Sequence, residues 1–349
     1  MENIDTKKYN IIPVYITREG KFISPHNAQS QSIYVDKISK FRKVEFVIGE
    51  PKIKIGNKLK KTINIDCVLN CMHGVNGEDG TISGLCQLCN MPITCPNALS
   101  SAICMDKIIM KDIFRANDLP CVDYIYFTRY DLHKNTKKVI EDAEKLGYPL
   151  IVKPANLGSS IGIAIAHDKA QLKSAIIVAE KYDSRIIVEK CIQNLREVNC
   201  SCLGDENECQ TSLLEEPNGW EEFLDFNEKY IKSKKQEKDR FDVNLPPKTK
   251  QQIQDLAKKA FKVFCCSGVI RIDFMIDTDL DKVYINELNT IPGSLAFYLW
   301  KHKYSYSQLI DQLVEIAINK NNTLNMNNYS YKSDVLLINK RNNLNKYTK

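Results

Sequence analysis

Short apolar runs rich in β-branched residues alternate along the chain with longer amphipathic stretches. Residues 9–17 (YNIIPVYIT) and 64–71 (NIDCVLNC) have the composition of buried strands, and turn residues follow each of them. We expect these two segments to be neighbouring strands of an α/β sheet. Residues 99–119 then predict a helix with an apolar stripe, which Pro120 ends before a strand at 121–127.

The alternation continues through the middle of the chain. Residues 131–146 and 169–181 have the periodicity of amphipathic helices, and YPLIVKP (148–154) and RIIVEKCI (185–192) are typical of buried strands. Strands that alternate with helices predict an α/β fold. We place a domain boundary near residue 104.

The last third of the chain begins with a polar stretch. Residues 215–250 carry many charges and few branched apolar residues, which predicts a long surface loop of the kind that often serves as a lid. Residues 248–264 predict a helix, and GVIRIDFMI (268–276) and KVYINELNT (282–290) predict two antiparallel strands joined by a turn. We expect the Asn- and Lys-rich residues 319–349 to form a flexible tail.

Composition narrows the class of protein. A chain of 349 residues that is 43% hydrophobic and 26% charged is long enough for one large or two to three modest domains. No apolar run approaches the roughly 20 residues that span a bilayer, and the start, MENIDTKKYN, lacks the features of a signal peptide. We therefore expect a cytoplasmic protein without a membrane partner. The net charge of +6 is spread along the chain, so we expect no nucleic-acid partner.

The chain contains 13 cysteines, which we expect to be free thiols in a reducing compartment. Cys86 and Cys89 form a CxxC pair, the spacing that zinc sites often use. A second pair with this spacing is absent from the sequence. Small buried apolar residues are therefore the favoured interpretation, with a structural zinc site as the alternative.

Two glycine-rich segments follow predicted strands. KPANLGSSIG (153–162) combines Lys153 with a turn whose backbone amides can approach phosphate oxygens, although the same composition suits an ordinary tight turn. HGVNGEDGTISG (73–84) bends sharply at the carboxyl end of a strand, where α/β sheets bind ligands. We expect Glu78 and Asp79 to cap the helix that follows.

Oxygen-bearing side chains are grouped on the predicted strand pair near the C-terminus. Asp273 lies on the first strand, and Glu287 and Asn289 share one face of the second because they are two residues apart. Carboxylate and amide oxygens suit Mg²⁺. Arg271 points to the same side as Asp273, and the rigid turn that ends at Gly293 can present a backbone amide to a reacting carbonyl.

Seven motifs, taken in order, resemble those of D-alanine–D-alanine ligases and of the related D-alanine–D-serine ligases of vancomycin resistance, over residues 9 to 318. The resemblance implies an α/β fold of the ATP-grasp type. It divides the chain into a truncated N-terminal substrate-binding α/β domain (1–103), a central ATP-grasp subdomain (104–190), a C-terminal ATP-grasp subdomain with metal site and lid (191–318), and the tail (319–349). The motifs are HGVNGEDGTISG, SSAICMDK, YPLIVKPANLGSSIGI, VEKCIQNLREVNCSCLG, DFNEKY, RIDF and NELNTIPGS.

The resemblance also implies roles for individual residues in ATP and metal binding. The cofactors are ATP and Mg²⁺, or Mn²⁺ in its place. Asp273, Glu287 and Asn289 would carry the metal. The residues expected to bind ATP are Lys107, Lys153 and Ser160 at the phosphates, Glu189, Lys190, Cys191 and Ile192 at adenine, and Glu197 at the ribose.

In this family the first D-alanine carboxylate attacks the γ-phosphate, and the second amino acid's amine then attacks the resulting acyl phosphate. Arg271 and the Gly293 amide match the groups that stabilise the tetrahedral oxyanion. A donor of this kind stabilises a transition state by about 3 kcal/mol. Lys229 and Tyr230 match the lysine–tyrosine pair in the lid of peptide-forming members. Ser159 matches the serine that forms a hydrogen bond with that tyrosine. The expected substrate residues are His73, Ser159, Tyr298 and Leu299.

Two features depart from the family pattern. The chain begins at what resembles the second strand of family members, so we expect the first strand and its glycine-rich loop to be missing, through either a start set downstream or an altered activity. Tyr298 stands where members place a carboxylate-binding serine. D-Alanyl-D-alanine synthesis for peptidoglycan precursors is the leading hypothesis. The alternatives are a D-alanine–D-serine ligase and a nucleotide-binding remnant, and a homodimer is a possible assembly.

Overall fold

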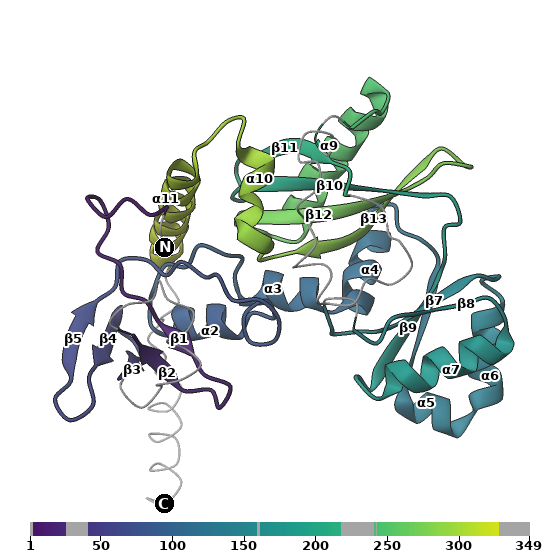
Figure 1. Ribbon diagram of the computed structural model, residues 1–349, viewed down its shortest axis with the longest axis horizontal. Coiled ribbons are helices and arrows are strands. Elements are labelled where there is room, and N and C mark those ends of the chain that lie inside the picture. Colours follow the sequence, from purple (N-terminus) through teal and green to yellow (C-terminus); the bar gives the residue numbers. More distant parts are fainter. Residues whose placement is uncertain (1–2, 26–40, 159–160, 218–240, 242, 328–349) are drawn as a thin grey trace, which may run out of the picture.

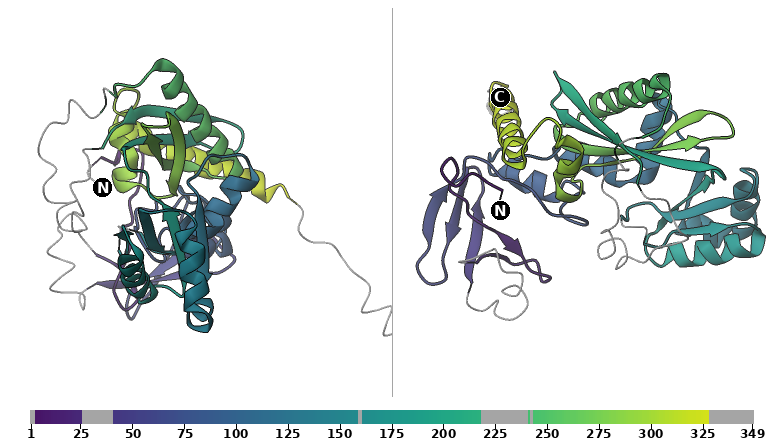
Figure 2. Two further views of the ribbon diagram at one scale, coloured as in Figure 1. Left: turned by 90° about the vertical axis from the view of Figure 1, so that its right-hand side faces the viewer. Right: turned by 45° about the horizontal axis from the view of Figure 1, so that its top comes forward.

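The computed structural model describes residues 3–25, 41–158, 161–217, 241 and 243–327. Three separate sheets lie along the molecule (Figure 1), one N-terminal, one central and one C-terminal in the sequence. The right-hand view in Figure 2 shows the N-terminal sheet at one end and the other two sheets together at the opposite end. A site built from more than one sheet can therefore form where the central and C-terminal sheets lie together.

The N-terminal sheet is an antiparallel meander, and our prediction for this region was wrong. Of residues 9–17 only two form a strand, and of residues 64–71 only Asn64, the end of a strand, and Val68, which makes an isolated bridge to Ile93, take part in β pairing. Pro13 has no N–H to donate to a ladder. Two of the remaining strands, at 42–47 and 52–55, alternate apolar with charged residues, a period-two pattern of one buried face. The order is β1 (Tyr15–Ile16), β2 (Phe22–Ser24), β3 (Arg42–Val47), β4 (Lys52–Ile55) and β5 (Lys61–Asn64).

Three helices lead from this sheet to the rest of the molecule. The single helix predicted at 99–119 is in fact two, because the Asp106 carboxylate accepts hydrogen bonds from the amides of Ile108 and Ile109, each at 3.0 Å, and so begins a new helix. The helices are α2 (Thr81–Leu88), α3 (Ala98–Met105) and α4 (Lys107–Ala116).

The central sheet has the strand order β6-β9-β7-β8 and is antiparallel throughout. Three helices cover one of its faces (Figure 1). The predicted strands and helices are all present, although the helix predicted at 131–146 is divided at Asn135, whose side chain caps the second piece. The elements are β6 (Tyr124–Thr128), α5 (Arg129–Lys134), α6 (Thr136–Glu144), β7 (Leu150–Pro154), β8 (Ala164–Ala166), α7 (Lys169–Glu180) and β9 (Arg185–Lys190).

The C-terminal sheet has the order β11-β10-β12-β13. The predicted strand pair at 268–290 and the predicted helix at 248–264 are confirmed. The sheet has two further strands, at 195–204 and 209–215, which the apolar pattern of the sequence did not predict. The elements are β10 (Leu195–Gly204), β11 (Cys209–Glu215), α9 (Pro247–Val263), β12 (Gly268–Asp277) and β13 (Lys282–Asn289).

The chain after β13 forms η2 (Gly293–Ala296), α10 (Phe297–Trp300) and α11 (Tyr306–Asn325). The tail predicted to begin at residue 319 is therefore helical as far as Asn325. Helix α11 returns to the N-terminal segment, where the Tyr9 hydroxyl donates to Asp311 at 2.6 Å and Lys8 pairs with the same carboxylate at 3.0 Å.

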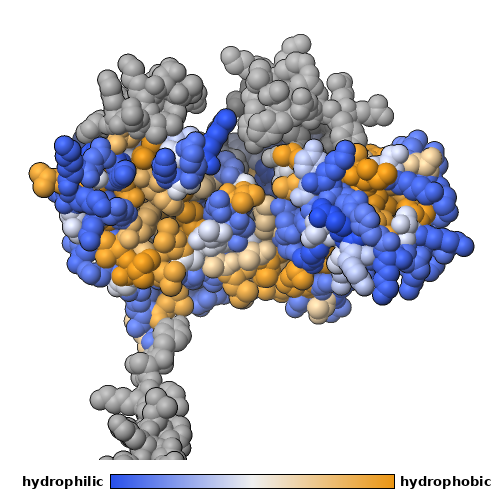
Figure 3. Space-filling model, turned by 90° about the horizontal axis from the view of Figure 1, so that it is seen from below, coloured by the Kyte–Doolittle hydropathy of each residue, from blue (hydrophilic) through white to orange (hydrophobic). Residues whose placement is uncertain are grey.

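One face of the molecule exposes many apolar side chains. Seen from below (Figure 3), apolar side chains gather on a broad part of the face. Large exposed apolar residues on or beside β3, α2 and α3 include Ile48, Leu88 and Leu99, each more than half exposed.

Cys86 and Cys89 are fully buried free thiols in the N-terminal core. Within the described ranges no helix is long and apolar enough to cross a membrane, and no group of three or more His, Cys, Asp or Glu is placed to hold a metal ion.

Candidate active site

Three lysines surround one glutamate between helix α4 and the central sheet. Lys107 and Lys111 lie one turn apart on α4, whereas Lys153 and Glu189 lie on the neighbouring strands β7 and β9. Lys153 Nζ donates to Glu189 Oε2 at 2.9 Å, and Lys111 Nζ lies 3.4 Å from Glu189 Oε1. Lys107 Nζ donates to the Leu157 carbonyl at 2.5 Å. All four ionisable side chains are buried.

The charges of this lysine cluster do not balance. Burial by itself would raise the pKa of Glu189, but the ammonium groups of Lys111 and Lys153 outweigh it and lower that pKa to about 2. Burial lowers the pKa of both Lys107 and Lys111, while Glu189 outweighs burial at Lys153 and raises its pKa. Three cations therefore face one buried carboxylate. Such an excess favours a bound anion, because an unpaired buried charge is costly.

Sequence reasoning identified Lys107, Lys153 and Glu189 but missed Lys111. The signal was present in the helix pattern: Lys111 falls inside the buried stripe that also contains Ile108, Met110 and Phe114. A lysine at such a position is rarely buried without a charged partner. Its partner, Glu189, comes from a distant strand, so only the fold brings the two together.

The polar face of the C-terminal sheet carries a second group of residues. Glu215, Asn199, Asp273 and Glu287 are directly opposite one another on successive strands and form one row across the sheet. The next row on the same face contains Ser201, Arg271 and Asn289. Residues between these rows, such as Ile272, point to the opposite face, where they pack against helix α9 in the core.

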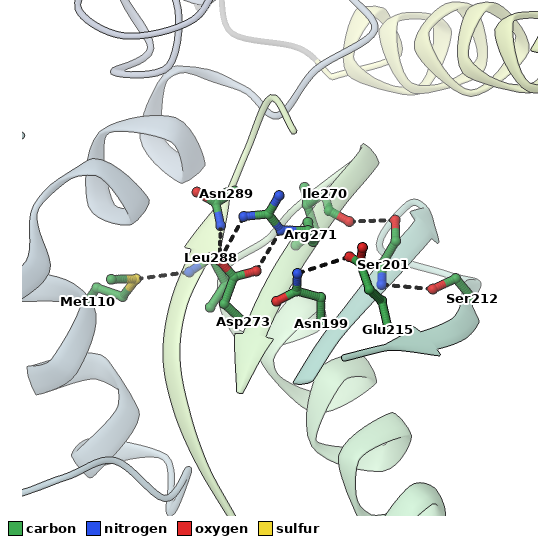
Figure 4. A network of polar contacts seen from close by, with 10 residues as sticks. All are labelled: Met110, Asn199, Ser201, Ser212, Glu215, Ile270, Arg271, Asp273, Leu288 and Asn289. Atoms are coloured by element: carbon green, nitrogen blue, oxygen red, sulfur yellow. Dashed lines mark hydrogen bonds and ion pairs between the residues drawn. The ribbon is translucent and has the colours of Figure 1, made fainter. Parts of the chain in front are cut away.

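Figure 4 shows how these side chains are directed. Arg271 donates to both oxygens of Asp273, at 2.6 Å from Nε and 2.8 Å from a terminal nitrogen. Asn289 donates to Asp273 at 3.0 Å, and Asn199 donates to Glu215 at 3.1 Å. Burial opposes the charge on Arg271, but Asp273 outweighs it and raises the arginine's pKa well above its usual value. The guanidinium is thus fixed in direction by a bidentate contact.

Asp273, Glu287 and Asn289 fit a divalent cation in their chemistry. Asp273 and Glu287 are directly opposite each other on paired strands, and Asn289 shares their face. Their carboxylate and amide oxygens are the donors that Mg²⁺ takes. Glu287 also acts electrostatically on Lys107, so this edge of the sheet adjoins the lysine cluster.

Helix α4 joins the two groups physically. Met110 Sδ accepts a hydrogen bond from the Leu288 amide on β13 at 3.4 Å (Figure 4). At the start of the helix, the Lys107 amide donates to the Ala155 carbonyl just beyond β7 at 3.0 Å. One helix therefore contacts both the central and the C-terminal sheet, and it carries two of the cluster's lysines.

The turn after β13 is strained. Ser294, Leu295 and Ala296 have φ values of 51°, 54° and 51°, in the left-handed region. Each such non-glycine residue costs roughly 1–2 kcal/mol, and strain of this kind is concentrated at functional sites. The turn begins at Gly293, where an added Cβ would meet no atom of the described residues within 4 Å. As far as these residues go, space is open beside Gly293, whose amide we expected to face a carbonyl.

The strained turn also places Tyr298 and Leu299. Burial raises the pKa of Tyr298, whereas a hydrogen bond and the positive charge of Arg271 oppose that shift. The Phe241 ring lies 6.3 Å from the Tyr298 ring, centroid to centroid. Leu299 is fully buried in the core beside Trp300, so any contact of Leu299 with a substrate falls to its backbone.

The glycine-rich loop at 73–84 lies beside the same turn. Thr290 Oγ1 donates to the Glu78 carbonyl at 3.3 Å, and His73 lies close enough to interact with the Ile291 backbone. Asp79 accepts from the first amide of α2 at 2.9 Å, as expected, but the Glu78 carboxylate turns back to the Gly74 amide at 2.6 Å and does not cap the helix. Only the Asp79 part of the capping prediction holds.

The remaining expected ATP residues end β9, follow it, or lie on β10. The Lys190 amide donates to the Asp123 carbonyl at 2.9 Å and the Cys191 amide donates to the Pro149 carbonyl at 3.0 Å, while Ile192 and Glu197 are partly buried. Ser159, Ser160, Lys229 and Tyr230 lie outside the described residues. Their assignments stay predictions.

Comparison with known protein families shows which family the chain belongs to. The family model described as the D-ala D-ala ligase N-terminus matches residues 1–96, and the model described as the D-ala D-ala ligase C-terminus matches residues 113–315. The chain belongs to the D-alanine–D-alanine ligase family. The predicted resemblance, the α/β ATP-grasp fold and the ligase class are confirmed.

Similar proteins cover most of the chain. The D-alanine–D-alanine ligase of Thermosipho melanesiensis is 38% identical over 92% of this chain and 88% of its own length. That of Acetivibrio thermocellus is 37% identical over 92% and 90%. Among solved structures, the D-alanine–D-alanine ligase from Coxiella burnetii (28% identity, 93% and 89% coverage) and the VanG D-Ala:D-Ser ligase from Enterococcus faecalis (28%, 90% and 92%) both superpose with a TM-score of 0.76. The family in general uses ATP and a divalent cation.

Proposed function

We propose that this protein joins two D-alanine molecules at the expense of ATP, as a step in making peptidoglycan precursors. The observation that carries the proposal is the pairing of two unlike groups across helix α4. One group is a buried cluster with an excess of cations, and the other is a carboxylate–amide row with a fixed arginine. A nucleotide triphosphate needs the first group, and an acyl transfer between carboxylate and amine needs the second.

The chain's own residues divide the work of the reaction. Lys107 and Lys153 hold the phosphates, and transfer of the γ-phosphoryl group to the first D-alanine carboxylate releases ADP and leaves an acyl phosphate. The amine of the second D-alanine then attacks the acyl carbon, phosphate leaves, and the nitrogen loses a proton. Arg271 and the Gly293 amide stabilise the oxyanion of that step. Asp273, Glu287 and Asn289 would hold Mg²⁺ or Mn²⁺, which supplies neutralisation of phosphate charge.

D-Serine is the second candidate for the acceptor. Tyr298 puts a phenol next to Arg271, where the acceptor's carboxylate end is expected, and so changes the groups available there. The similarity to a D-Ala:D-Ser ligase structure is as high as the similarity to a D-alanine–D-alanine ligase structure. Both acceptors therefore belong in the test.

Location, assembly and domain ranges extend the same proposal. We place the protein in the cytoplasm, where nucleotide and amino-acid substrates are available. The exposed apolar side chains near α2 and α3 suit a homodimer contact. The domain ranges 1–103, 104–190, 191–318 and 319–349 stay as predicted from the sequence.

The test is phosphate release by the purified protein with ATP and Mg²⁺, with D-alanine alone and with D-alanine plus D-serine, and with the products identified by mass spectrometry. We expect release that depends on D-alanine, D-alanyl-D-alanine as the product, and loss of both with Lys153→Ala. D-Alanyl-D-serine as the main product would select the second acceptor. ATP binding without D-alanine-dependent release would refute the ligase proposal.

A further inference from the structure

Lys111 has no role in the assignments above, yet it is the most deeply buried of the cluster's three lysines, with a relative exposure of 1%. Its ammonium lies 3.4 Å from Glu189 Oε1, which makes an ion pair rather than a close hydrogen bond. Neither that ammonium nor Glu189 Oε1 has a hydrogen-bond partner within the described part of the chain. A charge kept in such a place is destabilising by itself, so its retention calls for a function.

The glutamate is shared between two lysines through different oxygens. Glu189 Oε2 accepts from Lys153, while Oε1 faces Lys111. With two cations on one carboxylate, neither lysine is fully neutralised. Without Lys111, the whole negative charge of Glu189 would fall on Lys153, because both are buried and no solvent screens the pair.

We propose that Lys111 is a positioning residue for nucleotide binding: by sharing the Glu189 carboxylate through Oε1 it keeps that carboxylate from fully neutralising Lys153, and so leaves part of the Lys153 charge available to the phosphates of ATP. The inference rests on the proposed function only through the assignment of Lys153 to the nucleotide. Lys107 needs no such partner, since its ammonium is directed to the Leu157 carbonyl.

The test measures binding of ATP and of a non-hydrolysable ATP analogue by calorimetry, with Mg²⁺ and without D-alanine, alongside KM for each substrate. Lys111→Met should weaken nucleotide binding by about tenfold or more, within the usual range of coupling between neighbouring groups. KM for D-alanine should stay within about twofold, because the change leaves Arg271 and the strained turn untouched. Lys111→Arg, which keeps the charge, should retain nucleotide affinity.

The decisive variant is the double change Lys111→Met with Glu189→Gln. Glu189 is itself expected at adenine, so the reference for the double variant is Glu189→Gln alone. Without the carboxylate Lys111 has nothing to hold, and adding Lys111→Met to Glu189→Gln should change nucleotide affinity by less than about threefold. The matched control is Lys320→Met. It removes a half-buried lysine of helix α11 whose ammonium donates to Ser267 at 2.9 Å. Nucleotide affinity should not change in the control.

The outcomes separate the two proposals. Unchanged affinity in folded Lys111→Met, or a double variant that binds about tenfold more weakly than Glu189→Gln alone, would overturn the role of Lys111. The double variant removes both buried charges and should therefore fold even if Lys111→Met does not. Failure of the unaltered protein to bind ATP would instead refute the proposed function.

Discussion

The lysine cluster and the polar face of the C-terminal sheet handle charge in opposite ways. In the cluster, three lysines face one fully buried glutamate. On the polar face, Arg271 is paired with Asp273 through two hydrogen bonds, and both side chains retain some exposure. The first group has fewer carboxylates than cations, whereas the arginine of the second is already paired and oriented. The comparison teaches that unbalanced buried charge leaves room for an ionic ligand, as proposed for ATP, whereas balanced charge fixes the direction of a side chain, as proposed for Arg271.

The largest effect is expected from breaking the balanced pair. Arg271→Lys keeps a positive charge but loses the fork that grips both oxygens of Asp273, and it misplaces a donor to the oxyanion. We expect kcat to fall by about 10²–10³, measured as D-alanine-dependent phosphate release. Arg196→Lys is the matched control, since Arg196 on β10 of the same sheet also makes a bidentate pair, with Glu216 just beyond β11, but at a more exposed position. A comparable fall in the control would mean that sheet stability, not catalysis, is being measured.

The next effect comes from reducing the charge excess directly. Lys153→Met removes one of the three cluster cations, so the phosphates lose a partner. KM for ATP should rise by roughly 10–100-fold with little change in KM for D-alanine. Steady-state kinetics with each substrate varied in turn gives both values. An equal rise in both KM values would contradict a specific role at the nucleotide.

The place where the two groups adjoin provides a third test. Glu287→Gln removes a carboxylate that faces both the expected cation position and Lys107. We expect the Mg²⁺ concentration for half-maximal activity to rise about tenfold. Titration of activity with Mg²⁺ and with Mn²⁺ measures it. No shift with either ion would exclude Glu287 as a ligand.

The smallest effect concerns pH. The Glu78 carboxylate, 3.7 Å from Nδ1 of His73, raises the pKa of His73 above 6.5, and burial opposes that shift. A raised pKa means that the contact stabilises the loop fully below about pH 6.5 and that this contribution is lost as pH rises through the higher, folded-state pKa. His73 is half exposed, so solvent screens the contact. NMR titration of the His73 ring should show a lower pKa in Glu78→Gln, and an unchanged pKa would exclude the contact.

Spacing along the sequence placed the polar row well. Asp273, Glu287 and Asn289 were expected on one face of two paired strands, because residues two apart on a strand point the same way, and the register confirms that placement. The strained residues at 294–296 carry no such signal, since serine, leucine and alanine rarely adopt left-handed geometry. That geometry is imposed by packing of the turn.

The N-terminal region resisted prediction for a different reason. Its strands are short and carry lysine on one face, so their period-two pattern competes with the expectation of apolar strands. Lys111 escaped because its meaning depends on Glu189, a partner far away in the sequence. Local periodicity therefore located the elements near the site, while the pairing of charges between elements needed the fold.

The contact of Tyr9 and Lys8 with Asp311 has a consequence for the order of folding during synthesis. Contacts between positions so far apart in the sequence close last, because the chain between them must first be made and ordered. The segment around Tyr9 therefore leaves the ribosome long before helix α11 exists to receive it. Its apolar neighbours Ile12 and Ile16 pack in the N-terminal core, whose residues all precede α11, so that core can form first and the contact with Asp311 is added to it afterwards.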